Sequence, residues 1–479
     1  MAIVINTQPD TNIICSTLIP IVFDVTETTA STTNIIASCY YIDQATGLIT
    51  TQIGAEYRMA PNLSNVDNFI FDASEIFNIQ TKYTLNDAPN NWKLGQNSTL
   101  ALPFVIQDWR EIAGWKVRVK FQREYLDTTT GLIVLDPAYT NSNLFYIHEG
   151  SPTQKYLNQL VESNGQSGVN FTSVFDNYSI ANNPSKQNQQ NLFLTNHPLD
   201  GDTLRIDIHE TEQYMLGFFP DWSAYYTCEF RISVITYDVN KTPLSLHYVP
   251  DLIPVSDNLT TVSIGFRDLQ NSLTPSAGEG TNFSLVGYYS VYIQSSTSND
   301  PTSCNYLNFV PTITFKVDRS CILNSGYLRF CFKNMLGAFD QVTSKGVFKK
   351  SAKNKFTEYE QSLGYFPLKE KFHSMQFSKG NWSNENTISY SVTTQPMKPD
   401  FAKFFAEMFS STEVYLREKN DSNLLIQDST ADANALAVPY KFIPIVITGG
   451  SSPILNTDDN LVRLKFKFEM SVNQRNPRN

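Results

Sequence analysis

Charged residues are scarce in this sequence: 36 lysines and arginines and 46 aspartates and glutamates make up 17% of 479 residues. The shortage does not indicate disorder, because 32 phenylalanines and 24 tyrosines provide ample apolar surface to bury. Long apolar runs are also missing, and the longest one, around residues 442–447, is interrupted by Pro444. A membrane-spanning helix needs about 20 apolar residues. We therefore expect no membrane segment, and the uncharged start (Met1 to Val4) predicts no signal peptide.

Residues and motifs of common catalytic sites are equally scarce. The sequence contains no GxxxxGK[ST] phosphate loop and no GxGxxG, HExxH or GxSxG motif. Its five histidines leave few candidates for acid–base catalysis. One local cluster contains metal-binding residue types: Asp207, His209, Glu210 and Glu212. Two ligands on one strand do not make a metal site, so we interpret this cluster as the polar face of a strand and an acidic turn. We predict no catalytic, cofactor-binding or metal residues, and no enzymatic activity.

The six cysteines are spaced too widely for a zinc site, since no pair forms CxxC. Scattered thiols without a secretory signal are typical of a protein that folds in a reducing cytoplasm. We expect buried free thiols, although the sequence leaves open a disulfide between some pair. The cysteines are Cys15, Cys39, Cys228, Cys304, Cys321 and Cys331.

The chain is rich in uncharged polar residues, and its apolar residues often recur at every second position. Asparagine alone accounts for about 9% of the residues. Apolar and polar residues alternate from Trp115 to Gln122, from Cys228 to Val234, from Ile313 to Val317 and from Val462 to Val472. Alternation places successive side chains on opposite faces of a strand. Strands with one solvated face are typical of antiparallel sheets, so we predict a mainly β protein.

One stretch, Pro399 to Ser410, predicts a helix. Phe401, Phe404, Phe405 and Met408 form one apolar stripe at helical spacing. Pro399 suits the first turn, and Asp400 favours the positive end of the helix dipole. Strands around 414–416 and 440–448 follow this helix, so the final third is predicted to be α+β.

We expect three units that pack together, because no long Gly/Ser or Pro linker separates them. Residues 1–145 and 146–330 are predicted to form two β-sandwich (Ig-like) domains. Residues 331–479 are predicted to form a smaller α+β domain with an extended lysine-rich arm at 345–371.

Two basic features stand out in this acidic chain. The first is the strand face formed by Lys116, Arg118 and Lys120 and continued by Arg123, which we interpret as a solvated face. The second is the arm, where lysines lie at 345, 349, 350, 353, 355, 369 and 371. This segment lacks a sustained apolar period, so we expect an extended loop. It is either simply solvated or attracted to acidic surface, on a neighbouring subunit or on DNA.

Three further segments of the sequence are Phe69 to Phe77 (FIFDASEIF), Phe193 to Pro198 (FLTNHP) and Leu328 to Asp340 (LRFCFKNMLGAFD), followed by the helix and the strands up to Asn476. They are similar to segments of bacteriophage tail and neck proteins, and the resemblance is closest to the crAss-like group. They occur in the same order along nearly the whole chain. Gln341, Val342 and Thr343 stand where the family usually has an aromatic pair.

The resemblance implies a non-enzymatic virion protein that forms a ring in the neck or tail around the DNA channel. Its partners would be further copies of itself, the neighbouring portal, neck and tail ring proteins, and DNA in the lumen, contacted without sequence specificity. It would be assembled in the host cytoplasm and located in the virion. In the turn at Asn334, Gly337 and Asp340, glycine would supply a positive φ, and Asn and Asp would supply side-chain bonds to the backbone.

A weakly charged surface agrees with this assignment, because charges must be desolvated when subunits assemble. The alternative function is a host-attachment or carbohydrate-binding module of the virion. In that case Trp109, Trp222 and Trp382 would be exposed stacking platforms and not core residues. A glycan-degrading tail enzyme is the third and least favoured hypothesis.

Overall fold

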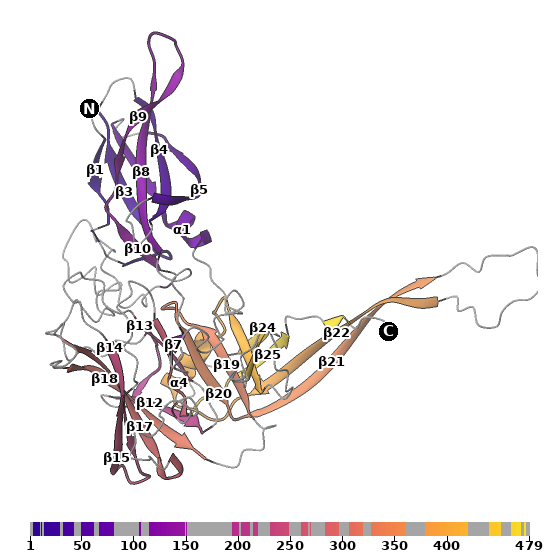
Figure 1. The fold of residues 1–479 in the computed structure, drawn as a ribbon. Coiled ribbons are helices and arrows are strands. Elements are labelled where there is room, and N and C mark those ends of the chain that lie inside the picture. Colours follow the sequence, from indigo (N-terminus) through magenta and orange to yellow (C-terminus); the bar gives the residue numbers. More distant parts are fainter. Residues whose placement is uncertain are drawn as a thin grey trace, which may run out of the picture. The chain divides into compact units, whose positions relative to one another are not determined.

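The protein is described from a computed structural model, and it is mainly β, as the sequence predicted (Figure 1). The structure describes residues 3–9, 11, 14–28, 32–42, 49–61, 67–80, 105–106, 115–148, 150, 194–200, 203–210, 214–218, 230–248, 260–266, 269, 283–296, 306–319, 327–360, 379–419, 440–451, 461–470 and 474–475. The chain divides into two units. Unit 1 contains Met1–Ser320 and Lys333–Asp340, and unit 2 contains Cys321–Phe332 and Gln341–Asn479.

The N-terminal subdomain of unit 1 consists of two sheets and a short helix. The larger sheet has the order β2-β10-β8-β4-β5, with β9 also paired to β8. Its strands are β2 (Ile14–Ser16), β4 (Thr32–Ile42), β5 (Ile49–Met59), β8 (Trp115–Leu126), β9 (Ile133–Asn141) and β10 (Phe145–His148). The smaller sheet, β1-β3-β6, contains β1 (Val4–Thr7), β3 (Val22–Thr26) and β6 (Asn68–Asp72), and α1 (Ser74–Gln80) follows it.

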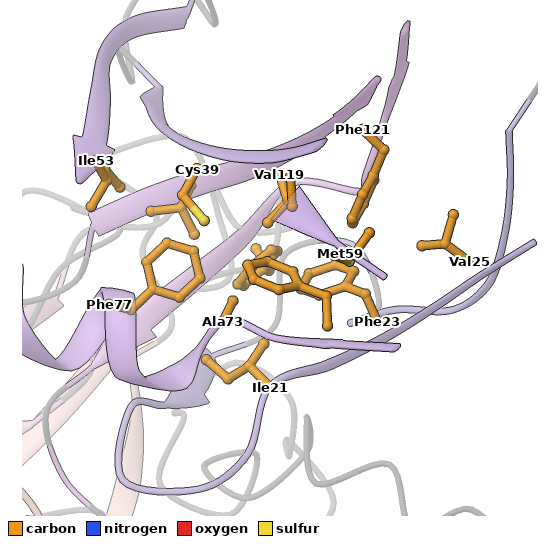
Figure 2. Packing of buried hydrophobic residues seen from close by; sticks show 14 of the residues in the cluster. Ile21, Phe23, Val25, Cys39, Ile53, Met59, Ala73, Phe77, Val119 and Phe121 are labelled. Carbon is orange, nitrogen blue, oxygen red and sulfur yellow. The ribbon is translucent and has the colours of Figure 1, made fainter. Parts of the chain in front are cut away.

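One core joins these two sheets. Phe23 and Phe71 of the smaller sheet contact Phe121 of β8, with ring centroids 5.5 and 6.4 Å away. Figure 2 shows these strands and α1 directing side chains, among them Phe23, Phe77, Val119 and Phe121, into a common cluster. Val117, Val119 and Phe121 are buried, so the apolar residues of the predicted alternation form the inward face of β8.

The second subdomain of unit 1 repeats this topology. Its larger sheet has the order β11-β12-β18-β17-β14-β15, and its smaller sheet has the order β13-β16-β7. The strands are β7 (Val105–Ile106), β11 (Leu199–Asp200), β12 (Thr203–His209), β13 (Met215–Phe218), β14 (Phe230–Tyr237), β15 (Pro243–Tyr248), β16 (Thr260–Ser263), β17 (Tyr288–Ser296) and β18 (Tyr306–Asp318). A 3-10 turn, η4 (Phe283–Leu285), precedes β17.

The match between the two subdomains extends to strand direction. If β9 and the short β11 are set aside, both larger sheets place their first strand in the chain beside their last, and these two strands are parallel. All other pairs in both sheets are antiparallel. In both subdomains the smaller sheet contains an antiparallel pair, β3–β6 or β13–β16. In chain order, the first strand of this pair follows the first strand of the larger sheet (β2 or β12), and the second precedes its fourth strand (β8 or β17). The parallel pairings were not predicted from the sequence.

Unit 2 is built on an eight-stranded sheet of order β20-β19-β23-β24-β25-β22-β21, with β26 paired to β22. Its strands are β19 (Leu328–Lys333), β20 (Phe339–Ser344), β21 (Val347–Glu360), β22 (Lys379–Thr393), β23 (Val414–Lys419), β24 (Tyr440–Ser451), β25 (Lys465–Met470) and β26 (Gln474–Arg475). The Lys333 end of β19 and residues 339–340 of β20 belong to unit 1.

Helix α4 (Pro399–Glu407) covers one face of this sheet and confirms the predicted helix, although it ends three residues early. Phe404, Phe405 and Met408 are buried, and the ring of Phe405 lies 6.1 Å from that of Phe466 on β25. Along β25, Phe466 and Phe468 are buried while Lys465 and Lys467 are exposed, which confirms the predicted alternation.

The lysine-rich segment is a strand over residues 347–360, so the expected loop is wrong there. Strand β21 pairs with β22 along its whole length, and Figure 1 shows them as a long ribbon. Lysines were compatible with a strand because the residues that alternate with them include Phe348, which packs against the core of unit 2. Residues 361–371 of the predicted arm lie outside the described residues. The boundaries predicted for three domains remain a prediction.

The entry into β21 gives a stability prediction. A Cβ on Gly346 would lie 1.9 Å from the carbonyl oxygen of Thr393, on the paired strand. Because backbone cannot yield cheaply, Gly346→Ala should lower the free energy of unfolding by about 2–3 kcal/mol in urea denaturation. Gly449→Ala is the matched control, since a Cβ at Gly449 meets nothing within 4 Å. Equal stability of the two variants would show that this close approach is not present in the protein.

Candidate functional site

The turn between β19 and β20 lies within the segment LRFCFKNMLGAFD and is held by hydrogen bonds of its own backbone. The amide of Gly337 donates to the carbonyl of Asn334 (3.0 Å), and the amide of Asn334 donates to the carbonyl of Ala338 (2.8 Å). Gly337 has φ +83°, a left-handed conformation that glycine adopts without steric cost. The sequence predicted this role for Gly337, and the prediction is confirmed.

The side chain of Asn334 makes three buried hydrogen bonds. Its Oδ1 accepts from the amide of Ala338 (3.0 Å), and its Nδ2 donates to Asp340 Oδ2 (2.8 Å) and to the carbonyl of Leu194 (2.6 Å). Asn334 therefore bonds the backbone as predicted, and Asp340 Oδ2 accepts a hydrogen bond from the side-chain amide of Asn334. Because Asp340 is buried, its carboxylate holds the Asn334 amide in one orientation, which fixes the whole turn.

The turn packs against the ends of two parallel strands of unit 1, β2 and β10. His148 at the end of β10 is fully buried, and its Nε2 donates to the carbonyl of Leu336 (2.8 Å). Gly150 lies so close that a Cβ there would be 2.4 Å from the backbone of Leu336. The carbonyl of Gly150 in turn accepts a hydrogen bond from Ser16 Oγ at the end of β2.

Leu194 fixes the turn from the second subdomain of unit 1. Its amide donates to the carbonyl of Gly217 on β13 (2.9 Å), while its carbonyl accepts from Asn334. The turn at 333–340 thus bonds elements of both subdomains within unit 1. Sequence reasoning missed His148 and Leu194 as partners of the turn. Asn334 and Leu194 are 140 residues apart, and no spacing pattern links them.

Burial lowers the pKa of His148 from its ordinary value of 6.5 to about 4. Desolvation of the charged ring is the largest cause, and the charge of Lys333 adds to it, whereas the bond to Leu336 opposes it. His148 is therefore neutral near pH 7, and its Nε2–H is kept as a donor for the turn.

The side chains of the predicted basic face of β8 are less exposed to solvent than we expected. Lys116 lies 5.5 Å from the ring centre of Tyr146, and Lys120 lies 4.7 Å from that of Tyr139. Lys116 and Lys120, which make these cation–π contacts, are half-buried, and so is Arg118 between them. The face is therefore an ordered surface of cations and tyrosine rings.

Lysines at the start of β21 remain accessible. Lys345, Lys349 and Lys350 are exposed, and Lys350 lies 5.4 Å from the ring centre of Tyr390 on the paired strand. Lys353 and Lys355 belong to β21, where Lys353 pairs with Thr387 and Lys355 with Glu385.

The residues of the cluster at 207–212 do not share one environment. Asp207 and His209 lie on β12, and the carboxylate of Glu210 pairs with Arg319 at 3.4 Å. Glu212 lies outside the described residues. Within the described ranges, no three His, Cys, Asp or Glu side chains come together as a metal site would require.

The described cysteines Cys15, Cys39 and Cys331 are buried thiols that form no disulfide, which confirms the prediction for these three. Burial raises the pKa of Cys39 to about 12, so this thiol is unreactive. Cys228, Cys304, Cys321, Trp109 and Trp222 lie outside the described residues. Trp382 belongs to β22, but its side chain is not described.

Comparisons with known proteins identify no relative: no family model matches the chain, and no curated protein matches it. No helix in the described residues is long and apolar enough to cross a membrane. Function must therefore be argued from the residues themselves.

Substitution of Asn334 tests the importance of the buried turn. Asn334→Ala leaves the carbonyl of Leu194, the carboxylate of Asp340 and the amide of Ala338 without this partner, so we expect a loss of about 3 kcal/mol in unfolding free energy. Met335→Ala, at a half-exposed position of the same turn, should cost less than about 1 kcal/mol. Urea denaturation followed by circular dichroism measures both. Similar losses for the two variants would contradict the role of the amide.

His148 predicts a pH dependence of stability. Its pKa is depressed on folding, so its contribution is present above about pH 6.5 and is lost as the pH falls towards 4. Replacing it in His148→Gln should remove up to about 3 kcal/mol of that loss. His197, whose pKa burial also lowers to about 4, leaves a remaining dependence of the same sign. Unfolding free energies at several pH values check this, and identical slopes for variant and wild type would refute it.

Proposed function

We propose that this chain is a non-enzymatic structural subunit of a virion, forming a ring in the neck or tail of a phage similar to the crAss-like group. One observation carries the proposal. Two of the segments that support the resemblance, FLTNHP and LRFCFKNMLGAFD, meet through the buried bond from Asn334 Nδ2 to the carbonyl of Leu194. Residues of both segments therefore act in one structural junction, as a scaffold protein requires.

The architecture gives further support. We propose that each subdomain of unit 1 is a β-sandwich of the Ig-like type, since a single core joins both sheets of the N-terminal subdomain. Such domains are rigid, and the weakly charged, aromatic-rich composition favours extensive contact with other subunits. Partners would be further copies of the chain and adjacent ring proteins, with DNA in the lumen. Localisation in the virion follows from the same proposal.

Self-assembly of the purified full-length chain tests this proposal. We expect light scattering to show a multicopy species and negative-stain microscopy to show closed rings. In purified virions, a multicopy band is expected at the 54.2 kDa of one chain. A strictly monomeric protein that is also absent from virions would refute the proposal. Turnover of a capsular or cell-wall glycan, abolished by one carboxylate substitution, would replace it with an enzymatic function.

A further inference from the structure

The outer face of the small sheet β1-β3-β6 is acidic and partly apolar. Phe23, Val25, Phe69 and Phe71 point into the core, so the residues that alternate with them point outward. We define the acidic face by the outward residues Val4, Val22, Asp24, Ile70 and Asp72 together with the neighbouring Asp67. Val4 is 57% exposed and Ile70 is 56% exposed.

Cations are scarce in the sequence that forms this face. Residues 1–81 contain eight acidic residues and a single cation, Arg58. Arg58 is itself paired with Glu124 of β8 at 2.6 Å. The acidic face therefore combines negative charge, which favours a basic partner, with exposed aliphatic side chains, whose burial in a contact is favourable.

Unit 2 carries a face of the opposite kind. On the side of its sheet away from α4, Lys465 and Lys467 of β25 are exposed, and Arg463 continues the row. Lys349 pairs with Ser391, which pairs with Lys467, so three adjacent strands present this surface. Val347 and Val446 on the same side are 74% and 54% exposed. Glu469, the strand partner of Val446, lies on this side as well and is half-buried, so cations outnumber acidic residues here. We define the basic face by Val347, Lys349, Val446, Arg463, Lys465 and Lys467.

We propose that the acidic face of one copy binds the basic face of a second copy; this inference rests on the proposed self-assembly and names its surfaces. Opposite charges steer the two faces together, and the aliphatic residues of both are buried in the contact. A polyanion such as DNA would match the basic face but would leave the acidic face, with its exposed Val4, Val22 and Ile70, uncovered. A second copy accounts for both faces.

The contact uses different surfaces on the two partners, so it is head-to-tail. Such contacts repeat from copy to copy and close into a ring when the rotation fits. Because charge contributes strongly, the assembly should weaken as salt shortens the screening length from about 10 Å at 0.1 M to about 3 Å at 1 M.

Charge-altering variants test the two faces separately. One variant is Asp67→Lys with Ile70→Lys, and the other is Lys465→Glu with Lys467→Glu. All four side chains are exposed, so the fold should be kept. Asp72 is left unchanged because its carboxylate accepts from the amides of Ile21 and Ser74. We expect each variant alone to self-associate at least about tenfold more weakly than wild type in analytical ultracentrifugation.

A mixture of the two variants gives the sharpest result. The first variant keeps the basic face and the second keeps the acidic face, so together they can form one native contact. The mixture should therefore recover association that neither variant shows alone, since the two charge-reversed faces are also opposite in charge and do not repel each other. Lys403→Glu, an exposed cation on α4, is the control and should assemble like wild type.

The outcomes separate this inference from the proposed function. If wild type does not assemble, the proposed function itself fails. If wild type assembles and both variants assemble equally well, these faces are not the contact and only the present inference is overturned. Binding of duplex DNA by wild type, lost in Lys465→Glu with Lys467→Glu without any change in assembly, would also overturn it.

Discussion

The orientation of one buried amide, that of Asn334, is the constraint on which the centre of this structure depends. The Asn334 side chain bonds its own turn through Ala338, a carboxylate through Asp340 and a distant segment through Leu194. Each bond replaces water for a buried group, so losing the amide exposes several unsatisfied partners at once. The β19–β20 turn, the end of β10 and the segment before β11 are thus coupled through a small set of polar atoms in an otherwise apolar interior.

The repeated topology of unit 1 gives this constraint its setting. Each subdomain places its first and last strands side by side and parallel, and in the N-terminal subdomain the ends of these strands, at Ser16 and His148, provide the seat for the turn. Neutral His148 serves as a donor there because burial keeps it uncharged. Charge is scarce in this chain, and most of the buried hydrogen bonds around the turn join uncharged groups. The acidic and basic residues that remain lie in different parts of the sequence. Acidic residues prevail in residues 1–81, and cations prevail at 345–355 and 463–467.

Much of the local structure could be predicted from the sequence, because it follows from single-strand or single-helix periodicity. The strands β8 and β25 and the helix at Pro399 belong to this kind, whereas the positive φ of Gly337 was expected from the resemblance of its turn. Long-range pairing could not be predicted: nothing in the residues near Ile14 or Leu204 indicates parallel partners in β10 and β18. The bond between Leu194 and Asn334 was missed for the same reason. In β21, lysines masked the strand because residues that face the core, such as Phe348, alternate with them irregularly. Predictions for the tryptophans and for residues 361–371 stay predictions.

Native-state hydrogen exchange of the Ala338 amide is the most direct test of this account. This amide donates to Asn334 Oδ1 within the buried turn. If the turn holds unit 1 together, the Ala338 amide should exchange only when unit 1 unfolds, with the same dependence on denaturant as the core amides of β8. Fast exchange of Ala338, independent of denaturant, while β8 stays protected would show that the turn opens locally, and it would contradict the central role assigned to Asn334.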